Sequence, residues 1–198
     1  MATSPTNVAH SGKTWLGHPR GLFLLFFVEM WERFSFYGMR ALLIFYLTQH
    51  FLFSDRDAAH SYGAYMSLIY ISPLMGGYLA DRYLGQRKAV LFGGIVIAIG
   101  HIILGLEADG SANSMGLGLF WLGLATVIIG TGFLKASVSA LVGQLYPRDD
   151  MRRDPAYTIF YMGINVGAAI GTILVGYLGE TIGWAWGSRS RCRGASTP

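Results

Sequence analysis

Three ionisable residues lie close together inside a long apolar segment of this chain. Glu29, Glu32 and Arg33 fall within residues 21–48, which otherwise consist mainly of Leu, Phe, Ile, Val, Tyr and Met. A charged side chain at membrane depth costs roughly 2.5–3.5 kcal/mol on insertion scales, so such groups pair with one another or face a watery cavity. The segment therefore predicts a membrane helix with carboxylate and guanidinium groups on a protected face.

Two further polar residues extend this face along the same helix. Glu29, Arg33, Tyr37 and Arg40 follow one another by four, four and three residues, which is the spacing of one helical stripe. Such a stripe favours a lined pathway for a polar, charged substrate and for protons. The alternative is a buried ion pair that only fixes helix packing.

Lys135 is a single charge in a second apolar segment. No other charged residue lies between Gly116 and Leu145, and an unpaired ammonium in lipid is costly. We therefore expect a carboxylate partner, for which Glu29 or Glu32 is the obvious candidate. A carboxylate whose cationic neighbours move can take up and release a proton.

The composition is that of an integral membrane protein. Hydrophobic residues make up 53% of the chain and charged residues 13%, whereas soluble domains have about 25% charged residues. The single cysteine, Cys192, excludes an internal disulfide framework and a cysteine-based metal site. The basic residues are scattered over loops and form no stripe, which argues against a nucleic-acid partner. We expect no metal and no cofactor.

The hydrophobic pattern predicts an all-α membrane protein with about five transmembrane helices. Asp55, Arg56 and Asp57 are expected in one loop, and the charged residues 81–88 in another. Residues 1–20 are expected to be a polar, mobile, cytoplasmic N-terminus, and residues 21–186 a bundle of membrane helices. The helices are predicted at about 21–50, 58–80, 88–106, 115–146 and 156–179.

The loop charges predict an orientation. Basic residues concentrate before the first helix and in loops 81–88 and 147–155, so the positive-inside rule places these segments and the N-terminus in the cytoplasm. Residues 187–198 are basic and lack membrane character, although the fifth helix should end outside. We interpret them as an aberrant tail from a frameshift or a gene-prediction error; the alternative is a real flexible tail.

Three motifs resemble those of a known family. The stretch Glu29-x-x-Glu32-Arg33-Phe34-x-Phe36-Tyr37-Gly38 closely resembles the ExxERFxYY signature of proton-dependent oligopeptide transporters, which belong to the major facilitator superfamily. Residues 77–88 resemble the superfamily's loop between helices two and three, and residues 160–167 resemble the family's helix-five signature. The chain departs from the pattern in two motifs: Lys135-Ala136-Ser137 stands where Lys-Pro-Asn is usual, and Phe36 stands where Tyr is common.

The resemblance implies a role for each matching residue. The implied proton-coupling residues are Glu29, Glu32, Arg33 and Lys135. The implied substrate-binding residues are Arg33, Tyr37, Arg40, Tyr70, Tyr161 and Asn165. The implied cytoplasmic loop motif consists of Gly77, Asp81, Arg82, Gly85, Arg87 and Lys88. Tyr161 and Asn165 are four residues apart, and an amide can both donate to and accept from a peptide backbone.

The resemblance also implies a fold, an activity and partners. Family members have two six-helix halves with the substrate between them, and this chain holds part of the N-terminal half. The implied function is proton-coupled symport of di- and tripeptides, with this truncated chain inactive alone and the missing C-terminal half as a partner. A bacterial inner membrane is the expected location. A non-transporting membrane remnant and a transporter of other solutes, such as nitrate, remain alternatives. A membrane enzyme is disfavoured, since the sequence contains no HExxH or GxSxG motif.

Overall fold

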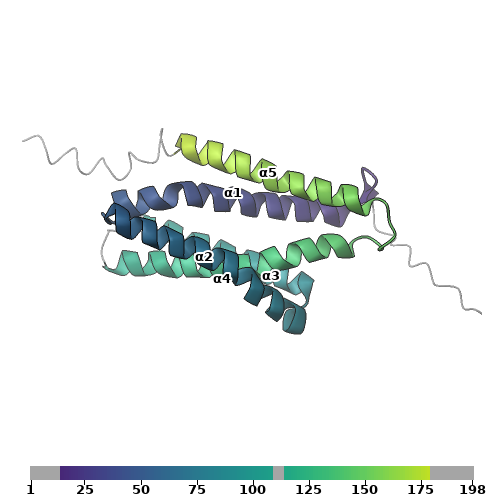
Figure 1. Cartoon of the computed structure of the whole chain (residues 1–198), viewed down its shortest axis with the longest axis horizontal. Helices are drawn as coiled ribbons and strands as arrows, with labels where there is room; N and C mark the ends of the chain where they lie inside the picture. Colours follow the sequence, from purple (N-terminus) through teal and green to yellow (C-terminus); the bar gives the residue numbers. More distant parts are fainter. Residues whose placement is uncertain (1–13, 109–113, 179–198) are drawn as a thin grey trace, which may run out of the picture.

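The computed structural model describes residues 14–108 and 114–178, and this part of the chain is almost entirely helical. The expected tail, residues 187–198, lies outside the described residues. A short antiparallel hairpin, β1 (Thr14–Trp15) and β2 (His18–Pro19), precedes the bundle (Figure 1). The described helices are α1 (Arg20–Gln49), α2 (Asp55–Leu79), η1 (Ala80–Leu84), α3 (Gln86–Ala108), α4 (Ser114–Gln144) and α5 (Arg153–Leu178). The all-α bundle predicted from the sequence is therefore confirmed.

The first turn of α2 corrects one expected loop. Asp55, Arg56 and Asp57 are helical, because Ser54 caps the helix and its hydroxyl oxygen accepts from the backbone N–H of Asp57 at 3.2 Å. Asp55 and Asp57 also lie at the positive end of the helix dipole, where carboxylates are stabilising. A charged run that looks like a loop is here a capped helix start.

The charged loop expected at residues 81–88 is also mostly helical. The π-helical turn η1 continues α2 to Leu84, and α3 begins at Gln86. Gly85 separates the two with φ 77° and ψ 150°, a conformation that is essentially restricted to glycine. Its backbone N–H bonds the carbonyl oxygen of Ala80 at 2.7 Å. The connection thus needs one glycine and not an open loop.

Glycines bring α5 close against α1. The glycines concerned are Gly163, Gly167 and Gly171, spaced by four residues on one face of α5. A methyl group at Gly167 would lie 2.2 Å from the carbonyl oxygen of Met30, and one at Gly171 would lie 2.6 Å from that of Phe34. Small residues at this spacing let helices meet at backbone distance in lipid. The backbone of α1 around its charged residues is therefore fixed by α5.

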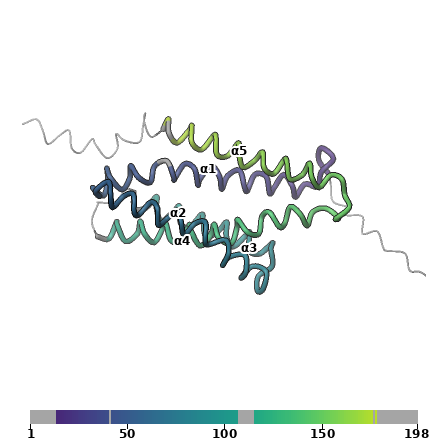
Figure 2. The backbone as a smooth tube through the Cα atoms, viewed as in Figure 1, coloured from purple at the N-terminus to yellow at the C-terminus, as the bar shows by residue number. Residues whose placement is uncertain are grey.

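The remaining helices gather around α4. Gly76 of α2 meets the backbone of Gly132, and Gly93 of α3 meets the carbonyl oxygen of Gly130. Figure 2 shows the result as two groups, with α1 and α5 together on one side and α4 with α2 and α3 on the other. Contacts between the two groups are fewer than contacts within them.

Two apolar clusters join these groups. The first connects the start of α1 with the end of α4 and the start of α5, and consists of Leu22, Leu25, Leu134, Val138, Val142, Tyr146, Ala156 and Phe160. The second connects the second half of α1 with the first halves of α2 and α4, and consists of Phe36, Leu43, Leu47, Ala58, Tyr65, Ile69, Phe120 and Leu124. The charged residues 29–33 lie on α1 between the two clusters.

A proline sits inside α2. Pro73 has no N–H for the carbonyl of Ile69, four residues earlier, and the hydroxyl of Ser72 donates to that carbonyl oxygen instead at 3.3 Å. On α4, Gly132 makes room for the carbonyl oxygen of Ser72, which would lie 2.8 Å from a methyl group there. The proline therefore lies next to a close backbone contact between the two helices.

Within residues 14–108 and 114–178, three segments are long and apolar enough to cross a membrane: Gln86–Leu106, Met115–Gln144 and Arg153–Val175. They cover most of α3, α4 and α5. By length α1 could also span, because its 30 residues extend about 45 Å at 1.5 Å each. α1 carries five charged side chains, Arg20, Glu29, Glu32, Arg33 and Arg40, and is therefore less apolar than these three segments.

The hairpin corrects the expectation that all of residues 1–20 are mobile; residues 1–13 lie outside the described part. Its turn residues Leu16 and Gly17 both have positive φ (50° and 79°), as type I′ turns require. His18 Nδ1 lies 2.7 Å from the hydroxyl of Tyr146, and Arg152 Nη1 donates to the carbonyl oxygen of Gly17 at 3.1 Å. The hairpin is thus tied to the segment between α4 and α5.

Ionisation states reinforce this attachment. Burial raises the pKa of Tyr146, so its hydroxyl stays protonated and can donate to the His18 ring. Hydrogen bonds from Arg152 lower the pKa of Asp150, so its carboxylate holds the Arg152 side chain at neutral pH. The Asp150 oxygens lie 3.1 Å from Nε and 2.8 Å from Nη2, which leaves Nη1 for Gly17.

Candidate functional site

The three charged residues of α1 form a compact buried cluster. Glu29, Glu32 and Arg33 are 3%, 6% and 7% exposed. Arg33 Nε donates to Glu29 Oε1 at 2.8 Å and lies 2.8 Å from Glu32 Oε2. The spacing of four residues, seen in the sequence, places Glu29 beside Arg33 on one helix face, and Glu32 directly precedes Arg33.

The two carboxylates are not equivalent. The single N–H on Arg33 Nε points to Glu29, and Glu32 Oε2 is buried without a hydrogen-bond partner among the described residues. The terminal amino groups of Arg33 form no hydrogen bond within residues 14–108 and 114–178. A buried acceptor without a donor is costly, so Glu32 is the carboxylate most in need of a proton or a new cation.

Lys135 approaches this cluster from α4, but the expected ion pair is not formed. Among the described residues its ammonium is in no ion pair and no hydrogen bond. Instead Nζ lies 4.8 Å from the ring centroid of Tyr70 and 5.7 Å from that of Phe36. The expectation of a direct carboxylate partner was therefore wrong for this conformation, because two aromatic rings hold the cation.

Charges balance within this group of residues. Two carboxylates on α1 contact one guanidinium on the same helix, and the Lys135 ammonium of α4 lies beside the neighbouring Phe36 ring. With both carboxylates ionised the group is neutral, and one bound proton gives it a positive charge. A group of residues that has bound one proton in this way would therefore attract an anion.

The stripe continues along α1 to Tyr37 and Arg40. Arg40 Nε donates to the hydroxyl of Tyr62 on α2 at 2.7 Å. Tyr37 is half-buried and its ring packs edge-on against Phe36 at 5.2 Å. Sequence reasoning missed Tyr62, which belongs to none of the recognised motifs. Its position on α2 eight residues before Tyr70 was the one available signal.

Tyr161 and Asn165 lie on the outside of the bundle. Tyr161 is 59% exposed, and the amide nitrogen of Asn165 donates to the Tyr161 carbonyl oxygen at 3.0 Å. The two residues therefore share one exposed face of α5, as their spacing predicts. Tyr70 is equally exposed, at 59%.

The 77–88 motif forms a separate group at the far end of α2. Arg82 Nη1 donates to the hydroxyl of Tyr78 at 2.9 Å, and its guanidinium also lies over the ring of Tyr83. Asp81 accepts a hydrogen bond from Gln86, across the Gly85 turn. Of the other motif residues, Gly77 packs against Ala136, whereas Arg87 and Lys88 are exposed. The structure does not bring this motif into the glutamate cluster.

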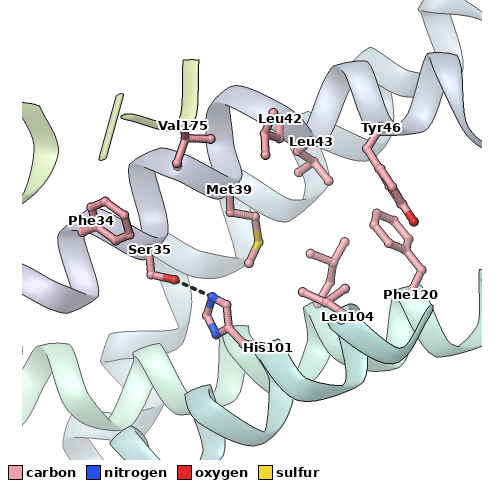
Figure 3. A pocket seen from close by; sticks show the side chains of 13 residues that line it. Phe34, Ser35, Met39, Leu42, Leu43, Tyr46, His101, Leu104, Phe120 and Val175 are labelled. Carbon is pink, nitrogen blue, oxygen red and sulfur yellow. Dashed lines mark hydrogen bonds between the residues drawn. The ribbon is translucent and has the colours of Figure 1, made fainter. Parts of the chain in front are cut away.

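A pocket of about 360 Å³ lies between α1, α3 and α4 (Figure 3). Its walls are mainly apolar; the polar groups on them are the Tyr46 hydroxyl and the side chains of Ser35 and His101, and the latter two hydrogen-bond each other across the pocket. His101 Nδ1 lies 2.8 Å from the carbonyl oxygen of Ile97 and must donate to it, so Nε2 can accept from Ser35 when the ring is neutral. None of the sequence-predicted site residues lines this pocket, and its apolar walls do not suit a charged peptide.

Comparisons with known proteins agree on one family. A family model described as POT family matches residues 87–188. The chain is 43% identical over 181 residues to the peptide transporter YePEPT of Yersinia enterocolitica, covering 89% of this chain and 34% of that protein. It is 40% identical over 191 residues to a di-/tripeptide transporter of Lactococcus lactis, covering 91% of this chain and 36% of that protein.

Solved structures show the same similarity. A crystal structure of a peptide transporter POT in complex with sulfate superposes with a TM-score of 0.80 at 37% identity, covering 98% of this chain and 40% of that one. A POT family transporter in complex with a thioalcohol-conjugated peptide gives a TM-score of 0.77 at 39% identity, covering 91% of this chain and 37% of that one. The chain spans about a third of the length of the curated relatives it matches.

Proposed function

The chain belongs to the POT family, and from that premise we propose that it supplies the N-terminal part of a proton-coupled di- and tripeptide transporter. Its relatives are peptide transporters, and the chain is a helical membrane protein. The observation that carries the proposal is the buried, charge-balanced cluster in which Glu32 Oε2 has no hydrogen-bond donor among the described residues.

Glu32 is the proposed proton acceptor. Its protonation would remove one negative charge beside Arg33 and leave the cluster positive. The terminal amino groups of Arg33, which form no hydrogen bond in the described residues, could then take the carboxylate of a peptide in a two-pronged contact. Proton uptake and peptide binding would thereby favour each other.

The remaining residues suit the rest of a peptide. An amide such as Asn165 can pair with a backbone without reading its side chains, and Tyr161 lies on the same exposed face. Tyr37, Arg40 and Tyr70 are proposed to line the same cavity. In the intact protein this cavity would lie between the chain and a C-terminal half, as in other transporters built from repeats.

The proposed setting is a bacterial inner membrane, with the N-terminus in the cytoplasm. The bacterial relatives support the source, and the basic residues of segments 81–88 and 147–155 support the orientation. On this orientation the hairpin and its partners Tyr146 and Arg152 lie on the cytoplasmic side.

A chimera tests the proposal. Residues 14–178 replace the matching segment of the Lactococcus lactis di-/tripeptide transporter, and the product is reconstituted into liposomes that are acidic outside. We expect uptake of radiolabelled dialanine driven by the pH gradient. Glu32→Gln should abolish that drive, whereas the exposed loop variant Asp149→Asn should retain it. The 198-residue chain alone should show no accumulation.

Two results would contradict the proposal. Gradient-driven uptake that survives Glu32→Gln would leave the cluster as a packing ion pair only. A chimera that inserts and folds but transports nitrate, or no solute, would instead favour one of the alternative readings of the sequence.

A further inference from the structure

Three helices meet at the ammonium of Lys135. The lysine comes from α4, the Phe36 ring from α1 and the Tyr70 ring from α2. Nζ lies 4.8 Å from the Tyr70 centroid and 5.7 Å from the Phe36 centroid, within the range at which a cation is attracted to the negative face of a ring. These contacts hold the charge at a place where no carboxylate of the described residues forms an ion pair with it.

The Phe36 ring lies close to two cations. The guanidinium carbon of Arg33 lies 5.8 Å from its centroid, so the ring borders both Arg33 and Lys135. Phe36 is 5% exposed and belongs to an apolar cluster, which fixes its position. Tyr70, in contrast, has more than half of its surface exposed. The Phe36 ring is thus held in place beside the ammonium, whereas the Tyr70 ring beside it is largely exposed.

Lys135 forms no ion pair with Glu29 or Glu32, and the reason is that Arg33 is already paired with both carboxylates. Its Nε is 2.8 Å from an oxygen of Glu29 and 2.8 Å from an oxygen of Glu32. A second cation inside that pair would lie close to the guanidinium and be repelled by it. Rings offer Lys135 an attraction without competition with Arg33.

We propose that Phe36 and Tyr70 are positioning residues that hold the Lys135 ammonium beside the glutamate cluster and outside an ion pair. The consequence for transport rests on the proposed function: when Arg33 turns to a peptide carboxylate, the Lys135 ammonium, which borders the same Phe36 ring as Arg33, would remain as the second cation of the cluster. The placement itself is a property of this chain and can be tested without transport.

The lysine content of the chain makes a direct test possible. Lys13, Lys88 and Lys135 are its three lysines, so selective ¹³C labelling of lysine gives three side-chain signals. Protons above an aromatic face resonate upfield through the ring current. In the full chain in lipid nanodiscs, we expect the ε-methylene protons of Lys135 upfield of those of the exposed Lys88.

Matched variants separate ring contact from general packing. Phe36→Leu and Tyr70→Leu should each move the Lys135 signal towards that of Lys88. Phe36→Tyr and Tyr70→Phe retain a ring and should retain the upfield shift. If the buried Phe36→Leu variant does not fold, the exposed Tyr70→Leu variant carries the test.

Three outcomes would overturn the inference. These are a Lys135 signal that coincides with that of Lys88, a signal unmoved by either leucine variant, and a signal that moves in Glu32→Gln but ignores the ring variants. The last would mean a direct ion pair. An upfield signal that responds to the rings, together with an inactive chimera, would leave the inference standing and remove only the proposed function.

Discussion

Replacing Gly167 with alanine should loosen the contact between α5 and α1 and disturb the charged cluster. The added methyl group would lie 2.2 Å from the carbonyl oxygen of Met30 and 3.0 Å from Cβ of Arg33. Met30 offers a backbone atom, which cannot rotate away as a side chain can. The two helices must therefore separate locally.

The size of the effect follows from this geometry. An ordinary contact at that point is 3.4–4 Å, so the backbones must move apart by roughly 1 Å. Overpacking of this kind costs about 1–3 kcal/mol, and a backbone obstacle points to the upper end. The helix propensity of alanine returns about 1 kcal/mol. The net expectation is a loss of about 2 kcal/mol in the free energy of unfolding.

Reversible unfolding of the chain in bicelles by added SDS, followed by circular dichroism, measures this loss. Gly63→Ala is the matched control, because Gly63 lies in α2 with nothing within 4 Å of the added methyl group. It should stabilise the chain by up to about 1 kcal/mol. The two variants make the same chemical change, but they should change the free energy of unfolding in opposite directions.

The result that refutes the reasoning is a Gly167→Ala chain that unfolds at the same or a higher SDS fraction than Gly63→Ala. The two backbones would then not approach as closely as the structure has them. In the chimera, Gly167→Ala should also lower dipeptide uptake, since the methyl group presses on Arg33.

Three further predictions concern individual polar side chains. Because hydrogen bonds from Arg152 lower the pKa of Asp150, their contact is complete above the ordinary aspartate value of about 4 and is lost as the pH falls through the lower folded value. Asp150→Asn should therefore raise hydrogen exchange in residues 14–19 at neutral pH, and unchanged exchange would contradict the contact. Ser137→Ala should leave the SDS midpoint unchanged or raise stability by up to about 1 kcal/mol, since the buried Ser137 hydroxyl has no partner in the described residues; a clear loss would reveal one. His101→Leu and Ser35→Ala, combined in a double-mutant cycle, should show a coupling of about 1 kcal/mol, and additive effects would speak against their hydrogen bond.

Much of the bundle and the centre of the site could be predicted from local spacing. Apolar periods locate the helices, and the spacings among Glu29, Glu32 and Arg33 place them on adjoining positions of one helix. Interactions within one helix depend on positions in the sequence alone. The salt bridges of Arg33 to both glutamates are the direct result.

Contacts between helices were harder to predict. Charge pairing suggested a carboxylate for Lys135, but the crossing of α1, α2 and α4 brings two rings to it instead. Spacing gives no information on which face of one helix meets another. Tyr62 was missed for the same reason, since its link to Arg40 exists only once α1 and α2 lie together.

Segment ends depended on single hydrogen bonds. The Ser54 cap turns an acidic run into a helix start, and the bonds of Tyr146 and Arg152 attach a hairpin that composition alone describes as polar and mobile. Hydrogen bonds of these kinds cannot be recognised from composition.

The proline in α2 has a mechanical consequence. The Ser72 hydroxyl covers the carbonyl of Ile69 that Pro73 leaves without its usual donor, so α2 can act as a hinge at this level without presenting a bare polar group to lipid. Tyr70 lies on one side of this hinge and the 77–88 motif on the other. Bending there would redirect the charged end of α2 while the ring beside Lys135 keeps its place.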